Sequence, residues 1–257
     1  KIGDKRRIAN SFHNLGVLCT MRGNHNEALE YYNQSLNLQE RISDKIGMGY
    51  TLGNIGSIYE LKGEHDLALN YKNRSLLIKE ELGDKRGIES RLHGIGYILL
   101  NKGEYDQALD YFNRSLAIGE EQGWKGIIGM ILNLIGDIHL QKSDYDQALD
   151  YYTRSLKIKE ELGEEHELYI ITNLFLANKH LGKEYDVQEI HKLIAEADEI
   201  DYGINFSLYE LLEDKSYLEK AYEKIQERTD AMSDELKQKF LNYPIPKQII
   251  QEWEGVS

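Results

Sequence analysis

The chain repeats itself every 40 residues. The segment Gly103–Leu116 reads GEYDQALDYFNRSL. The segments that precede and follow it by 40 residues, Gly63–Leu76 and Ser143–Leu156, read GEHDLALNYKNRSL and SDYDQALDYYTRSL. A fixed period of roughly 20 to 50 residues is typical of solenoid proteins, in which each unit packs on its neighbours. Stacked units present an extended surface rather than one deep pocket, so the period favours binding over catalysis.

Each period contains two helical patterns joined by a short polar turn. In the third copy, Ile88, Leu92 and Ile95 follow the spacing of one helix face, and Ala108 and Phe112 begin a second apolar face. Short turns of this kind join antiparallel helix hairpins. We expect an Asp or Asn to cap the second helix and a glycine to end it in the left-handed conformation. The expected caps are Asn26, Asp66, Asp106, Asp146 and Asp186, and the expected terminal glycines are Gly83, Gly123 and Gly163.

A glycine also recurs inside the first helix of each unit. Glycine inside a helix costs about 1 kcal/mol of helix propensity, so a close helix–helix contact should compensate for it. We expect the small residue twelve positions later, on the second helix, to make this contact. The pairs are Gly16 with Ala28, Gly56 with Ala68, and Gly136 with Ala148; Gly96 and Ala108 occupy the same positions.

This pattern of residues resembles the tetratricopeptide repeat. The second copy carries it as Ile55, Gly56, Tyr59, Ala68 and Ser75, and the third as Ile95, Gly96, Leu99, Ala108, Phe112 and Ser115. The 40-residue period is similar to the long-helix variety found in LGN-type, kinesin-light-chain-type and bacterial peptide-sensor proteins. The resemblance covers about residues 4–195 and implies an all-α, right-handed superhelical solenoid of antiparallel helix hairpins. It departs from the pattern at Lys72 in the second copy and at Leu176, Gln188 and His191 in the fifth.

We expect five repeats over residues 1–195, followed by a different C-terminal part. The repeats span about 4–43, 44–83, 84–123, 124–163 and 164–195. Residues 196–257 are expected to form a degenerate sixth helix pair and C-terminal capping helices, with a turn over Asn242–Pro246 and a last helix over Lys247–Trp253. The alternative for the last segment is a docking peptide for another protein.

The first residues resemble the junction between two repeats, because KIGDKR at Lys1–Arg6 is similar to ELGDKR at Glu81–Arg86. This similarity predicts a fragment of a longer protein. The alternative is a native N-terminus with a short cap-like remnant.

Composition argues against several classes of function. The formal net charge of −13 disfavours binding to nucleic acid or to an anionic membrane surface. Cys19 is the only cysteine, and no signal peptide or long apolar run is present, which favours a cytoplasmic location. The sequence shows no metal-ligand spacing and no catalytic motif, so we expect no metal, no cofactor and no enzymatic activity.

The resemblance to the tetratricopeptide repeat implies that the first helices line a concave groove, which fixes the candidate partner-binding residues. Amide and imidazole groups there can hydrogen-bond a peptide backbone, while Tyr97 and Leu100 offer apolar contacts. For Asn133 and Asn173, the alternative is that they only solvate an exposed face. The candidate residues are His13, Asn14, Asn54, His93, Tyr97, Leu100, Asn133, Asp137 and Asn173.

The groove positions also bear on the kind of partner. None of them holds Lys or Arg, whereas the chaperone-binding branch of the family uses a carboxylate clamp of Lys, Arg and Asn, so a neutral or basic protein or peptide is favoured. The expected function is a protein–protein interaction scaffold. The alternative is a sensor or regulatory arm of a larger signalling protein, such as an ATPase, kinase or protease. Replacing Asn133 and Asn173 by alanine is expected to weaken partner binding with little change in thermal stability.

Overall fold

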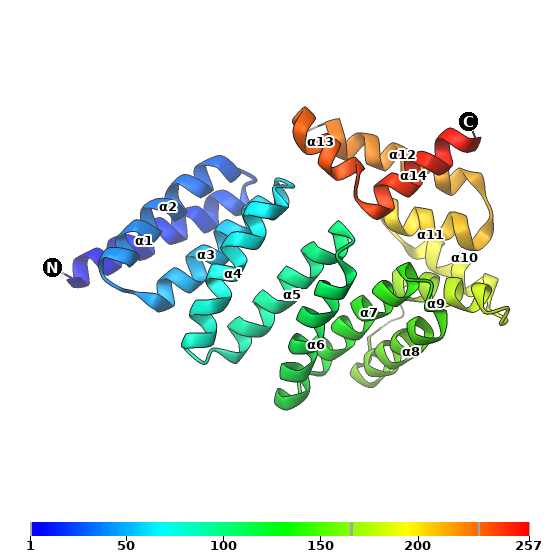
Figure 1. Cartoon of the computed structure of the whole chain (residues 1–257), viewed down its shortest axis with the longest axis horizontal. Helices are drawn as coiled ribbons and strands as arrows, with labels where there is room; N and C mark the ends of the chain where they lie inside the picture. The colour runs from blue at the N-terminus through cyan, green and yellow to red at the C-terminus, as the bar shows by residue number, and fades with distance from the viewer. Residues whose placement is uncertain (1, 165–166, 231, 257) are drawn as a thin grey trace. The chain divides into compact units, whose positions relative to one another are not determined.

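The computed structural model describes residues 2–164, 167–230 and 232–256, and this part of the chain forms fourteen α-helices and no strand. The all-α prediction is therefore confirmed. The helices are α1 (Ile2–Met21), α2 (His25–Arg41), α3 (Lys45–Leu61), α4 (His65–Glu81), α5 (Lys85–Lys102), α6 (Tyr105–Gln122), α7 (Lys125–Gln141), α8 (Tyr145–Leu162), α9 (Leu168–His180), α10 (Val187–Glu196), α11 (Tyr202–Leu212), α12 (Lys215–Asp230), α13 (Asp234–Leu241) and α14 (Pro244–Val256) (Figure 1).

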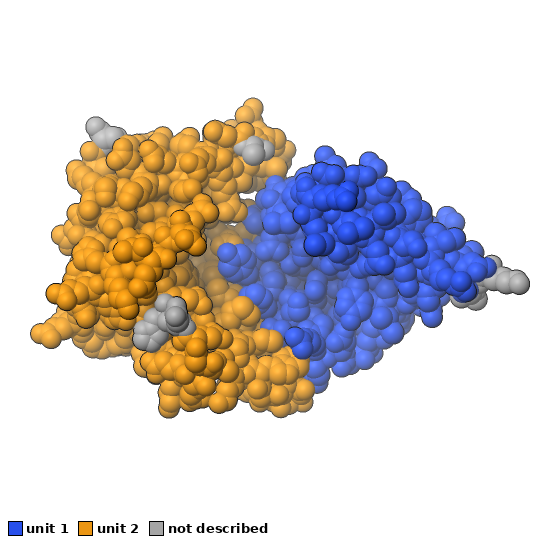
Figure 2. Space-filling view, turned by 180° about the vertical axis from the view of Figure 1, so that it is seen from behind, with its two compact units in different colours: residues 1–98 blue, residues 99–257 orange. Residues whose placement is uncertain are grey.

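The chain divides into two compact units, residues 1–98 and residues 99–257 (Figure 2). The division falls within α5. Unit 1 therefore contains α1 to α4 and most of α5, and unit 2 contains the end of α5 and all later helices. Each unit is described by itself below.

Within each unit the helices form hairpins whose members lie side by side, as α1 with α2, α3 with α4, and α7 with α8 (Figure 1). The second helix of one hairpin packs on the first helix of the next, as α2 on α3 and α8 on α9. The turns inside the first two hairpins contain Gly23 and Gly63, both at φ +76°. Left-handed backbone is cheap only for glycine, which explains why glycine recurs in these turns.

The glycines inside the first helices contact aromatic rings rather than the expected alanines. A Cβ added to Gly16 would lie 2.6 Å from Cε1 of Tyr32, and one added to Gly136 would lie 2.7 Å from Cε1 of Tyr152. The ring comes from the second helix, 16 positions after the glycine. The ring rather than the predicted alanine is nearest to the glycine in these two hairpins, because the larger side chain reaches across to the bare helix backbone. The missing Cβ makes room for a buried ring.

Lysine takes the place of the ring in the second hairpin. A Cβ on Gly56 would lie 2.9 Å from Cγ of Lys72 and 3.3 Å from the backbone oxygen of Ala68. The alkyl chain of Lys72 thus packs where the other hairpins hold an aromatic side chain. Its ammonium group forms an ion pair of 2.8 Å with Glu60, which compensates the buried charge.

A second contact inside each hairpin joins a buried serine to a backbone carbonyl of the first helix. The serine hydroxyls of the second helices donate to carbonyls 26 positions earlier: Ser35 to Ala9 at 2.8 Å, Ser75 to Gly49 at 2.6 Å, and Ser155 to Gly129 at 2.7 Å. A buried hydroxyl without a partner would be destabilising, so these bonds fix the register between the two helices.

The second helices begin earlier than the sequence predicts. The N-cap of α6 is Glu104, which makes no side-chain capping bond, and the expected cap Asp106 lies in the first turn. The N-caps Asn24, Glu64 and Asp144 show the same shift for α2, α4 and α8. The helix starts directly after the tight glycine turn, and an acidic residue in the first turn still complements the helix dipole.

Two other capping predictions hold. Asp186 is the N-cap of α10 and accepts hydrogen bonds from the backbone N–H groups of Gln188 and Glu189. Gly83, Gly123 and Gly163 have φ values of +66°, +68° and +72°, so the predicted left-handed helix ends are confirmed.

The C-terminal helices of unit 2 share an apolar core. Phe206 and Leu218 of the α11–α12 hairpin are buried together with Phe240 of α13 and Ile249 of α14. The last helix begins at Pro244, so the expected turn over Asn242–Pro246 and the helix start at Lys247 are wrong. Proline is well tolerated in a first helical turn, where its missing N–H has no partner to lose.

The glycine–ring contact leads to a stability prediction. Gly136→Ala should lower the free energy of unfolding by about 1 to 3 kcal/mol, because its methyl group would overlap the buried Tyr152 ring. Gly126→Ala is the matched control in the same helix, since its nearest neighbour would lie 4.0 Å away. Urea unfolding of both variants checks this. Equal stability of the two would show that the ring can move aside at no cost.

Candidate functional site

The nine predicted partner-binding residues all lie on first helices of the hairpins. In each unit, we call the surface formed by these positions on its own first helices the first-helix face of that unit. Unit 1 carries His13, Asn14, Asn54, His93 and Tyr97, and unit 2 carries Leu100, Asn133, Asp137 and Asn173. The two sets are therefore considered separately.

In unit 1 the structure brings His13 of α1 and Asn54 of α3 together. Nδ1 of His13 lies 2.9 Å from the hydroxyl of Thr51, and Nε2 lies 3.5 Å from Nδ2 of Asn54. Asn54 also donates to the hydroxyl of Tyr32 at 3.4 Å. Burial lowers the pKa of His13, which favours the neutral imidazole. The two residues thus form a polar joint between neighbouring hairpins.

The other predicted residues of unit 1 differ in exposure. Asn14 is exposed, and Tyr97 is 42% exposed. His93 is half-buried, and its pKa is lowered by burial and by the nearby charge of Lys72.

A cavity of about 350 Å³ opens beside His13, between α1 and α3. Gln39, at the end of α2, lines it and is only 1% exposed, yet its Oε1 atom has no hydrogen-bond donor among the described residues. A buried amide oxygen without a donor is unfavourable unless a ligand or water supplies one. The lining residues are Arg6, Asn10, His13, Gln39, Asp44, Ile46, Gly47 and Tyr50.

In unit 2 the predicted residue Asp137 is the centre of a buried polar cluster. Its carboxylate accepts hydrogen bonds from the hydroxyls of Tyr152 at 2.8 Å and Tyr169 at 2.6 Å, and from Nδ2 of Asn173 at 3.3 Å. Burial raises the pKa of Asp137 to about 6, and the three hydrogen bonds oppose that rise. The cluster joins α7, α8 and α9.

Asn133 and Asn173 are buried rather than exposed, at 9% and 4%. The alternative that they only solvate an exposed face therefore does not fit. The Oδ1 atom of each is buried without a donor among the described residues. Because Asn173 also bonds Asp137, we now expect its replacement by alanine to reduce stability as well. Partner contact by the nine residues stays a prediction.

Sequence reasoning missed an arginine on the first-helix face of unit 1. The guanidinium of Arg91, from α5, occupies the space that a side chain at Gly53 of α3 would fill. A Cβ at Gly53 would lie 2.8 Å from the guanidinium carbon. The available signal was a glycine where the other copies hold His or Asn, with an arginine 38 positions later.

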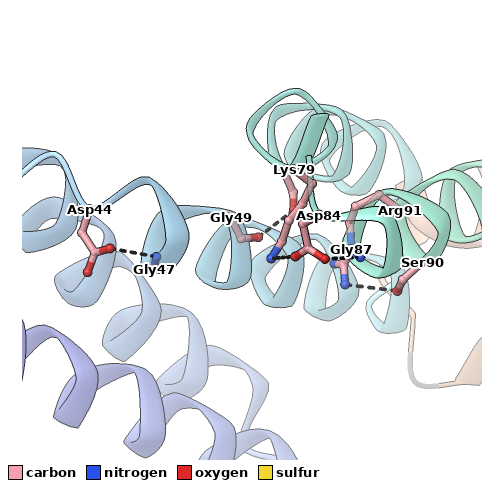
Figure 3. Close-up of polar contacts among 9 residues, drawn as sticks. Asp44, Gly47, Gly49, Lys79, Asp84, Gly87, Ser90 and Arg91 are labelled. Atoms are coloured by element: carbon pink, nitrogen blue, oxygen red, sulfur yellow. Dashed lines mark hydrogen bonds and ion pairs between the residues drawn. The ribbon is translucent and has the colours of Figure 1, made fainter. Parts of the chain in front are cut away.

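Two further cations approach the same face of unit 1. Lys79 is buried, forms an ion pair of 2.8 Å with Asp84, and places its ammonium 3.4 Å from the centre of the Tyr50 ring (Figure 3). The ammonium of Lys72 would lie 2.9 Å from a Cβ at Gly94 of α5. Both lysines come from α4, a second helix, so a survey limited to the first helices does not find them.

Two features that would suggest other functions are absent from the described residues. No helix there is long and apolar enough to cross a membrane. No group of three or more His, Cys, Asp or Glu side chains in the described part of the chain is arranged to hold a metal ion.

Two sequence profiles of repeat families match the chain. The profile described as Tetratricopeptide repeat matches residues 1–41 and 47–121, and the profile described as SHNi-TPR matches residues 131–166. No curated protein matches the chain significantly.

Solved structures match the fold at low sequence identity. The apo form of RapI is 16% identical with a TM-score of 0.70, covering 95% of this chain and 75% of that one. BtubC from P. vanneervenii is 16% identical with a TM-score of 0.60, covering 76% and 87%. A Rap protein in complex with Competence and Sporulation Factor is 16% identical with a TM-score of 0.55, covering 95% and 66%. At this identity the similarities show the fold alone.

The buried carboxyl of Asp137 leads to a pH prediction. Its pKa in the folded chain is about 6, above the ordinary value of 3.8, so protonation stabilises the fold. That contribution is complete below the ordinary pKa and is lost as the pH rises through about 6. Asp137→Asn removes the ionisation. Its free energy of unfolding, relative to the unmodified chain, should therefore rise by about 2 kcal/mol between about pH 4.5 and pH 7.

Urea unfolding at several pH values checks this difference. Other acidic groups titrate in both proteins and cancel in the comparison. A difference that does not change with pH would show that Asp137 titrates normally in the folded chain.

Proposed function

Because the chain belongs to the tetratricopeptide repeat family, we propose that it is a protein–protein interaction scaffold. It binds a peptide or an extended segment of a partner protein on the first-helix face. The partner contributes backbone N–H and C=O groups to the polar side chains of that face, and one of its side chains enters the cavity between α1 and α3.

The observation that carries this proposal is the cavity beside His13. His13 is the predicted face position that lines it, it lies between the first helices of two successive hairpins, and its volume of about 350 Å³ accommodates a single large side chain. Gln39 also lines the cavity, and its Oε1 atom is buried without a donor among the described residues. The lining combines apolar surface from Ile46 and Tyr50 with several polar side chains, an arrangement suited to specific recognition of one residue.

Unpaired acceptors elsewhere on the face support recognition of an extended chain. The Oδ1 atoms of Asn133 and Asn173 are buried and lack donors, and successive backbone N–H groups of an extended segment are suitable donors. Among proteins of similar fold, one Rap structure contains Competence and Sporulation Factor, which supports a binding role for folds of this kind.

Charge limits the class of partner. With a net charge of −13, the chain repels polyanions at long range, so a partner of neutral or basic overall charge associates more readily than a nucleic acid or an anionic membrane. The alternative function, a regulatory arm of a larger signalling protein, stays a prediction, as does the cytoplasmic location.

Display of random peptides against the immobilised chain tests the proposed function. Peptides selected on the unmodified chain should bind Asn10→Trp at least about tenfold more weakly, because the indole fills the cavity that Asn10 lines. Fluorescence anisotropy with the synthesised peptides measures the loss of affinity.

Asn37→Trp is the matched control, since Asn37 is exposed on the second helix α2. It should leave peptide affinity unchanged. The proposal is wrong if no peptide is selected, or if both tryptophan variants weaken binding equally.

A further inference from the structure

We propose that Arg91 is an anchor for one carboxylate of the bound segment, on the first-helix face of unit 1. This rests on the proposed function, because it names a group that the partner must carry. The carboxylate is an Asp or Glu side chain or the C-terminus of a segment that is otherwise neutral or basic.

The glycine at position 53 creates the seat for the guanidinium. Any side chain there would overlap it, since a Cβ would lie 2.8 Å from the guanidinium carbon and 3.4 Å from Nη2. Gly53 is buried in α3, and the Arg91 side chain from α5 covers it. The guanidinium thus already lies on the face in the partner-free chain, and such preorganisation lowers the entropic cost of using it.

Few groups within the chain compensate the positive charge of Arg91. Its Nη2 atom donates a hydrogen bond to the hydroxyl of Ser90 at 3.3 Å, and its Nε atom is buried without an acceptor among the described residues. Burial lowers the pKa of Arg91, while Asp84, Glu60 and Glu89 act in the opposite direction. Arginine remains charged under all ordinary conditions, so the burial cost stays.

Asp84 and Glu60, the two acids that act most strongly to raise the pKa of Arg91, already form ion pairs with lysines. Asp84 pairs with Lys79 at 2.8 Å and accepts a hydrogen bond from the backbone N–H of Gly87 at 2.9 Å (Figure 3). Glu60 pairs with Lys72 at 2.8 Å. Each acid therefore compensates a buried lysine, and no carboxylate of the described chain lies within ion-pair distance of Arg91.

A ligand carboxylate matches what Arg91 lacks. The planar fork of a guanidinium binds a carboxylate through two parallel hydrogen bonds, and a partly buried pair of this kind is stronger than an exposed one. A single negative charge is preferred over a phosphate, because Asp84, Glu60 and Glu89 lie near enough to repel a second charge.

Arg91 does not occupy a predicted groove position, since it lies two residues before His93 on α5. Its guanidinium reaches the face of unit 1 over Gly53 of α3. It also lies close to the cavity: Tyr50, which lines the cavity, is one helical turn before Gly53 on α3. A segment bound at Arg91 can therefore place a neighbouring residue at the cavity.

The test uses the peptides selected on the unmodified chain. They should be enriched in Asp, Glu or a free C-terminus, and neutralising that group by Asn, Gln or an amide should weaken binding about tenfold or more. On Arg91→Gln the acidic peptide should bind as weakly as the neutral one, so that neutralisation has no further effect. Arg114→Gln, on the second helix α6, is the matched control and should preserve the full difference.

A second variant keeps the positive charge of Arg91 and removes only the space beside Gly53 that its guanidinium occupies. Gly53→Ala should displace the guanidinium and reduce the preference for the acidic peptide, whereas Gly126→Ala, a helical glycine with open space beside it, should not. This variant decides the matter if Arg91→Gln fails to fold.

The outcomes distinguish failure of the carboxylate anchor at Arg91 from failure of the proposed peptide-binding function. If peptides bind but neutralisation costs the same affinity on the unmodified chain and on both variants, the anchor is wrong while the binding face stands. If no peptide binds the unmodified chain, the proposed function fails and the anchor fails with it.

Discussion

Three hairpins depend on a close contact between a glycine of the first helix, Gly16, Gly56 or Gly136, and the side chain that the second helix places against it. Gly16 receives the Tyr32 ring and Gly136 receives the Tyr152 ring. The same rings carry hydroxyls that reach the first-helix face, where Tyr32 meets Asn54 and Tyr152 meets Asp137. The contact that holds the hairpin together therefore also positions polar groups on the first-helix face of each unit. A helix glycine, unfavourable by about 1 kcal/mol on its own, serves both purposes.

Most of the fold could be predicted because the signals are local. Apolar spacing, polar turns and terminal glycines act over a few residues, and Gly83, Gly123 and Gly163 end their helices as expected. Errors arose where two local solutions compete. An acidic residue suits both an N-cap and a first helical turn, so the position of Asp106 alone did not decide where α6 begins.

The candidate site could be predicted by position but not by environment. The repeat places Asn173 and Asp137 on the first-helix face, yet their hydrogen bond joins residues 36 positions apart, and only the packed hairpins bring them together. Arg91 shows the same limit more strongly. Its proposed role depends on Gly53, a residue of another helix that leaves room for the guanidinium because it has no side chain. No pattern within a single repeat relates these two positions.

Contacts within one hairpin and contacts between successive repeats respond differently to changes in the gene. Duplication or deletion of one 40-residue unit leaves every serine–carbonyl bond and every glycine–ring contact within its own hairpin. The contact of Arg91 with Gly53 joins two successive 40-residue repeats, so inserting another repeat between them would separate the two residues. Recombination among the copies would thus lengthen or shorten the array while preserving each hairpin, and would change which side chains meet at the junctions between repeats.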